Sequence, residues 1–251
     1  MRSATCVAAI ASALALATPA AATWSIVAVD PATREVGIAG ASCFPGSVVI
    51  AGVVPGRGAV AAQGLTSVAA RDRAVALLRE GVAPAAIVTT IRATAVDDAW
   101  APMRWLRQYG VASLVGAATA TAAYTGPLAL PWRGDRPGRG VSVQGNVLRS
   151  PAVLDRALAA FTATPERCGL ASALLRGLAA GGAEGGDRRC SREQTALSAF
   201  LVVARDGDEA DAPQLRLVTP DQEPGGANPV ELLRELLRTR GAAPDAKECD
   251  P

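Results

Sequence analysis

Thr23 is the residue of greatest chemical interest, because it directly follows a pattern for cleavage by signal peptidase. Residues 1–22 combine a positively charged start, an apolar stretch and the triplet Ala20-Ala21-Ala22, which is typical of a signal peptide. Cleavage after Ala22 makes Thr23 the N-terminus, and a β-rich run begins at the same residue. Its hydroxyl can then act as a nucleophile, with its own α-amine (pKa about 7.7–8.0 in peptides) as the base. The alternative is that threonine stands there only because it favours strands.

Few other residues of this chain can act as a base. The sequence contains no histidine, which excludes Ser-His-Asp and Cys-His catalysis and histidine metal sites. Its only lysine, Lys247, lies near the C-terminus, so we expect neither a Ser-Lys dyad nor a Schiff-base lysine. Carboxylates and the α-amine remain as bases, and we expect no metal and no cofactor.

Composition limits the classes of partner. The formal net charge of +2 falls by one when Arg2 leaves with the signal peptide, and no run of basic residues follows it. With aromatic residues at only 4 %, we expect no binding of nucleic acid. No apolar run after residue 22 reaches about 18 residues, so we expect no membrane span after processing.

The cysteine count suits export to the periplasm or exterior. Four cysteines remain once Cys6 leaves: Cys43, Cys168, Cys190 and Cys249. An even number in an exported chain indicates disulfides, with three possible connectivities. Four free thiols are the alternative.

Patterns along the chain predict strands and helices in alternating groups. Apolar, β-branched runs separated by turn residues predict strands. They lie at 24–29, 35–42, 47–54, 58–63, 108–115, 118–125, 141–148, 195–205 and 214–218. Helical spacing with end signals predicts helices. They lie at 71–79, 84–94, from Ser150-Pro151 onward with Ser150 as the N-cap, 170–180, and 229–240 with Asn228 as the N-cap.

The remaining segments predict loops and a tail. Residues 128–140 are rich in proline and glycine and predict a loop. We expect one domain over residues 23–240 and a polar, disordered tail over 241–251. Helices that arrive in pairs between groups of strands favour an α+β fold with antiparallel sheets and helices outside.

Three stretches, taken in order, resemble one known family. They are Thr-Trp-Ser-Ile-Val-Ala-Val-Asp-Pro at 23–31, Gly-Val-Ser-Val-Gln-Gly-Asn-Val-Leu at 140–148, and Gly-Gly-Asp-Arg-Arg-Cys at 185–190. Together they resemble the family called domain of unknown function 1028, which is grouped with the N-terminal nucleophile (Ntn) hydrolases. The resemblance implies a four-layer αββα sandwich of two antiparallel sheets, with Thr23 at the nucleophile position.

The resemblance also bears on the cysteines and on activity. It implies a disulfide between Cys43 and Cys190, because exported relatives of this pattern carry cysteines at these two places. One departure counts against activity, because proteasome-type members use a lysine near the threonine. This chain has no such lysine in its core.

Five further residues are candidates to support Thr23. Ser25 lies on the same strand face and is a candidate hydrogen-bond partner, and Gln63 ends a strand that can point into the same cleft. Asn146, in Gln-Gly-Asn at a strand end, can donate to an oxyanion or simply form a turn. Asp187 and Arg188 belong to a loop that either binds a substrate carboxylate or is solvated.

Two functions remain open at this stage. One is an exported hydrolase that uses Thr23 to cleave a small-molecule or peptide amide. The other is a catalytically silent protein of the same fold that binds a small ligand. Whether the protein is an enzyme and whether it forms an oligomer both stay open.

Overall fold

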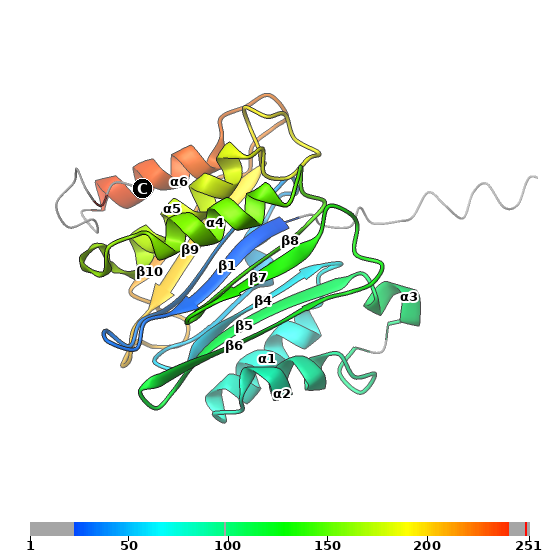
Figure 1. The fold of residues 1–251 in the computed structure, drawn as a ribbon, viewed down its shortest axis with the longest axis vertical. Helices are drawn as coiled ribbons and strands as arrows, with labels where there is room; N and C mark the ends of the chain where they lie inside the picture. The colour runs from blue at the N-terminus through cyan, green and yellow to red at the C-terminus, as the bar shows by residue number, and fades with distance from the viewer. Residues whose placement is uncertain (1–22, 98, 241–248, 250–251) are drawn as a thin grey trace, which may run out of the picture.

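The computed structural model describes residues 23–97, 99–240 and 249 (Figure 1). The predicted signal peptide at 1–22 and the predicted tail at 241–251, except Cys249, lie outside the described residues. Two antiparallel sheets form the centre. The first has the order β10-β9-β2-β1-β8-β7 and the second the order β3-β4-β5-β6. The predicted α+β class with antiparallel sheets is confirmed.

The strands of the first sheet are β1 (Thr23–Val29), β2 (Val36–Ser42), β7 (Gly134–Gly138), β8 (Val141–Asn146), β9 (Ser198–Ala204) and β10 (Leu215–Val218). Those of the second are β3 (Ala51–Val54), β4 (Gly58–Gly64), β5 (Arg107–Val115) and β6 (Ala118–Thr125). The helices are α1 (Val68–Arg79), α2 (Pro84–Ile91), α3 (Ala101–Arg104), α4 (Ala152–Thr162), α5 (Gly169–Ala183) and α6 (Pro229–Thr239), with the short 3-10 helices η1 (Ser47–Ile50) and η2 (Glu166–Cys168).

β1 is a central strand, with β2 on one side and β8 on the other. All seven of its residues are buried, which is why the sequence is apolar almost throughout rather than alternating. Trp24 and Ile26 face the helices of the first sheet, whereas Val27 and Val29 face the second sheet. This strand therefore joins two of the apolar layers.

Helices cover the outer faces of both sheets (Figure 1). Leucines of α4, α5 and α6 pack on the first sheet, among them Leu154, Leu178 and Leu233. Ala74, Leu78 and Ile87 of α1 and α2 pack on the second. The apolar layer between the sheets combines alanine and valine side chains with larger ones such as Ile38, Leu114 and Phe200.

Several local predictions differ from the structure, and four of them have a clear physical reason. Ser47–Ile50 is the 3-10 helix η1 and not strand, because Gly46 turns the chain with a positive φ of 68°. The predicted loop contains β7, an edge strand, where Pro137 is tolerated because no ladder bond is needed on the open side. α1 starts at Val68, since Ser67 caps it by accepting from the Ala70 amide. Ser150 makes no side-chain cap for α4, whose N-cap is Pro151.

Two disulfides tie distant segments together. One joins Cys43 to Cys190, the pair that the resemblance implied, and the other joins Cys168 to Cys249. Among the described residues, no helix has the length and apolar character needed to cross a bilayer.

Candidate functional site

Thr23 is the first residue of β1 and is only 1 % exposed. Its register partner is Asn146, the last residue of β8. Side chains alternate along a strand, so Thr23 shares the face of Ser25 and Val27, which looks toward the second sheet. Thr23 therefore lies at one end of the space between the two sheets.

A network of buried amide and hydroxyl groups fills this end of the interface. Gln63 of β4 accepts from Ser25 Oγ at 2.6 Å. Its Nε2 donates to the Thr23 carbonyl oxygen at 3.2 Å and to Gln108 Oε1 at 2.8 Å. Gln144 Nε2 donates to Ser25 Oγ at 2.6 Å. These hydrogen bonds therefore fix the first residues of β1 against the second sheet.

The same network includes Asn146 and continues toward the surface. Asn146 Nδ2 donates to Gln108 Oε1 at 3.1 Å. Gln108 Nε2 donates to Thr125 Oγ1 at 2.9 Å, and Thr125 Oγ1 donates to Asp135 Oδ1 at 3.1 Å. Asp135 is half-buried, so this chain of bonds connects the interior to a carboxylate near solvent.

The network is closely packed and carries no charge in its buried part. Gln63, Gln108 and Gln144 are fully buried. A Cβ atom at Gly110 would overlap the Gln144 amide, so glycine at that position makes room for the network. Buried amides of this kind persist only when they are hydrogen-bonded, because an unpaired one costs about 1–3 kcal/mol.

Asp187 and Arg188 hold a neighbouring loop to this end of the sheet. The fully buried Asp187 carboxylate accepts from the Cys43 amide at 2.8 Å and from Arg189 Nη2 at 2.7 Å. Arg188 is exposed, and its backbone amide donates to the Val147 carbonyl at 3.0 Å. The loop is further fixed by the disulfide from Cys43.

The structure thus brings some of the predicted site residues together. Ser25, Gln63 and Asn146 meet beside Thr23 in one network. The hydroxyl of Ser25 binds Gln63 and Gln144, instead of the Thr23 side chain as expected. Asp187 is buried and binds the guanidinium of Arg189, whereas Arg188 is exposed. The sequence analysis did not predict three members of the network, Gln108, Thr125 and Asp135. For Gln108, a polar glutamine at the start of an apolar strand was a signal that could have been used.

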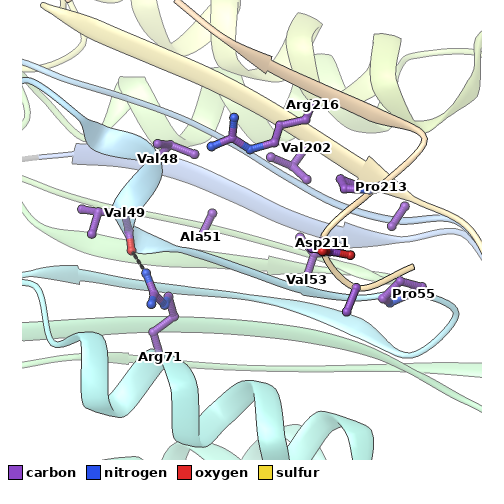
Figure 2. A pocket seen from close by; sticks show the side chains of 12 residues that line it. Val48, Val49, Ala51, Val53, Pro55, Arg71, Val202, Asp211, Pro213 and Arg216 are labelled. Carbon is purple, nitrogen blue, oxygen red and sulfur yellow. Dashed lines mark hydrogen bonds between the residues drawn. The ribbon is translucent and has the colours of Figure 1, made fainter. Parts of the chain in front are cut away.

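Some cavities lie away from Thr23. One, of about 340 Å³, opens between the edges of the two sheets, at β3 and η1 on one side and β9 and β10 on the other (Figure 2). Its walls combine apolar side chains such as Val53 and Val202 with the charged Asp211, and Arg216 reaches over it from β10. Figure 2 also shows Arg71 of α1 bound to the Val49 carbonyl, at 2.7 Å. Thr23 does not line this cavity.

Comparison with known proteins gives a family but no activity. Among curated proteins, none matches this chain significantly. The crystal structure of protein SPO2555 from Silicibacter pomeroyi, itself described by the DUF1028 family model, is similar with a TM-score of 0.71 and 26 % identity. The match covers 89 % of this chain and 88 % of that one. The model for the "Family of unknown function (DUF1028)" matches residues 23–226, and the chain belongs to this family.

Proposed function

We propose that this protein is an exported Ntn-type hydrolase of amide bonds, with Thr23 as its N-terminal nucleophile once residues 1–22 are removed. The observation that carries the proposal is the position of Thr23 as the first residue of a central, fully buried strand. The family model begins to match at the same residue. A threonine exposed there as the N-terminus would be held by β8 on one side and by Gln63 on its carbonyl oxygen.

The architecture supports the same proposal. Two antiparallel sheets face each other, and helices lie on their outer faces (Figure 1). We infer from this arrangement the αββα sandwich of the Ntn hydrolases. The two disulfides suit an oxidising compartment, which favours the periplasm or the exterior as the final location.

In the proposed reaction the Thr23 hydroxyl oxygen attacks the carbonyl carbon of a small-molecule or peptide amide. The α-amine takes the hydroxyl proton and passes it to the leaving nitrogen, so an ester forms on Thr23 as the C–N bond breaks. Water then attacks the ester, releases the acid and restores the hydroxyl. With no histidine in the sequence, the α-amine is the base that stands closest to this oxygen.

A catalytically silent ligand-binding protein is the second candidate, and one observation favours it. The amide groups of Gln63 and Asn146 already donate to groups inside the network. The N–H groups of Gln63 in particular are engaged by acceptors inside the network, whereas a hydrolase needs donors directed at the developing oxyanion. Under this alternative the network only stabilises the end of the two sheets.

The N-terminus of the exported protein tests the first step of the proposal. The protein is expressed with its signal peptide, collected after export, and measured by intact mass and by N-terminal peptide mapping. The proposal requires a chain that starts at Thr23. A chain that starts at Ala21, Trp24 or any other residue contradicts it and leaves the ligand-binding alternative.

A further inference from the structure

A cavity on the outer face of the second sheet has the features of a separate ligand site. Its volume of about 340 Å³ is at the lower end of the range of about 300–1,000 Å³ that is typical of small-molecule sites. Residues of α2, α3, β5 and β6 line it. The residues that matter for its chemistry are Arg92, Asp97, Arg104, Trp105, Tyr109 and Tyr124.

Tyr109 provides a hydroxyl group that lacks a partner. The side chain is fully buried, and within the described part of the chain its hydroxyl makes no hydrogen bond. Burial, reinforced by the negative charge of Asp97, raises the pKa of Tyr109 above its usual range, so the group remains a donor. Buried hydroxyls without partners are costly, and an oxygen atom of a ligand in the cavity would satisfy this one.

Positive charge dominates the cavity. Three arginines line it, against a single carboxylate, that of Asp97. Arg107 is the partner of that carboxylate, with Nε at 2.8 Å from Oδ2, and it also donates to the Leu65 and Thr66 carbonyls. Arg107 is therefore neutralised within the protein.

Among the described residues, the other two arginines have no acidic partner. Arg92 lies over the Tyr124 ring, with its guanidinium carbon 3.8 Å from the ring centroid. Arg104 has a buried Nε, and among the described residues this atom has no hydrogen-bond partner. Neither arginine forms an ion pair with another described residue. Two unpaired cations and one unpaired hydroxyl donor thus border the same space.

We propose that this cavity binds a small oxyanion ligand, a carboxylate or a phosphate. The oxygen atoms of the ligand accept hydrogen bonds from Tyr109 and Arg104 and lie next to the positive charge of Arg92. Guanidinium groups bind both carboxylates and phosphates well. Trp105, which is 46 % exposed at the rim, offers a flat apolar surface to the rest of the molecule.

This site does not depend on Thr23 being a nucleophile. Gln108 and Tyr109 are consecutive residues of β5, so their side chains point to opposite faces of the second sheet. Gln108 belongs to the network between the sheets, and Tyr109 belongs to the cavity outside. The oxyanion site is therefore separated from the Thr23 site by one sheet.

Titration calorimetry with two probes, benzoate and inorganic phosphate, tests the proposal on the full exported protein. We expect saturable binding of one ligand per chain for at least one probe, and the probe that binds more tightly distinguishes a carboxylate site from a phosphate site. Arg104→Gln should weaken binding roughly tenfold, as expected for a charged hydrogen bond. Arg139→Gln, which removes the same charge from an exposed position outside the cavity, should bind as the unchanged protein does.

Tyr109→Phe separates a ligand-binding role from a structural one. Without the unpaired hydroxyl, the ligand-free variant should unfold at the same or a higher temperature, while its affinity falls several-fold. The proposal is overturned if neither probe binds, if Arg104→Gln binds as tightly as Arg139→Gln, or if Tyr109→Phe keeps full affinity.

Discussion

Replacing Gln63 with methionine tests how strongly the buried network fixes the start of β1. Methionine nearly preserves the volume of the side chain but removes its amide. The amide oxygen accepts from Ser25 Oγ, and the two N–H groups are shared among the Thr23 carbonyl, Gln108 Oε1 and the Gln144 carbonyl. At about 1 kcal/mol for each of these three donor or acceptor groups, and about 1 kcal/mol more for the Ser25 hydroxyl proton left without its acceptor, we expect the unfolding free energy to fall by about 4 kcal/mol.

Urea unfolding followed by circular dichroism, with the disulfides intact, measures this loss. Gln222→Met is the matched control, because that glutamine makes a single side-chain bond near the surface, to the Pro220 carbonyl at 2.8 Å. The control should change stability by less than about 0.5 kcal/mol. If Gln63→Met costs less than about 1 kcal/mol, or no more than the control, the network does not stabilise this end of the sheets as argued.

Three further predictions concern other parts of the molecule. The disulfide between Cys43 and Cys190 joins residues 147 positions apart, and its removal in a Cys43→Ala/Cys190→Ala variant should lower the unfolding free energy in urea by about 4–5 kcal/mol. A decrease below about 1 kcal/mol contradicts this. Asp97→Asn should cost about 3 kcal/mol, because it leaves the buried guanidinium of Arg107 without its charge partner; a neutral effect in the same assay speaks against it. Because burial raises the pKa of Tyr109 above its unfolded value of about 10, stability should fall as the pH rises past about 10. The absorbance of the Tyr109 phenolate, identified as the part of the signal that the Tyr109→Phe variant lacks, should then appear only when the protein unfolds. If it appears in the folded protein near pH 10, the raised pKa of Tyr109 is refuted.

Most of the fold could be predicted from local patterns. The apolar runs of β1 and β9 and the capped helix α6 are found where sequence signals place them, with Asn228 accepting from the Val230 amide as an N-cap should. One misassigned segment depends on a contact that is distant in sequence. β7 is rich in glycine and proline and forms a strand only because β8 pairs with it, which is a non-local contact.

The site was predictable in its residue types more than in its contacts. Thr23 and Ser25 could be placed on one strand face by alternation alone. The bond between Ser25 and Gln63, however, connects the two sheets across 38 residues of sequence, and the bond between Gln63 and Gln108 connects paired strands of the second sheet across 45 residues. Such contacts depend on how distant strands pair and how the two sheets pack on each other, and no local pattern carries that information. For the same reason Asp187 could not be assigned to the Cys43 amide, which is 144 residues away.

The most direct test of the central claim compares three forms of the exported protein in one assay. The forms are the chain that starts at Thr23, its Thr23→Ala variant, and a chain with one extra residue before Thr23. Hydrolysis of a library of small-molecule and peptide amides should occur with the first form only, because the second lacks the nucleophile and the third has an amide in place of the basic amine. Equal hydrolysis by all three forms would contradict the assignment of Thr23 as the nucleophile.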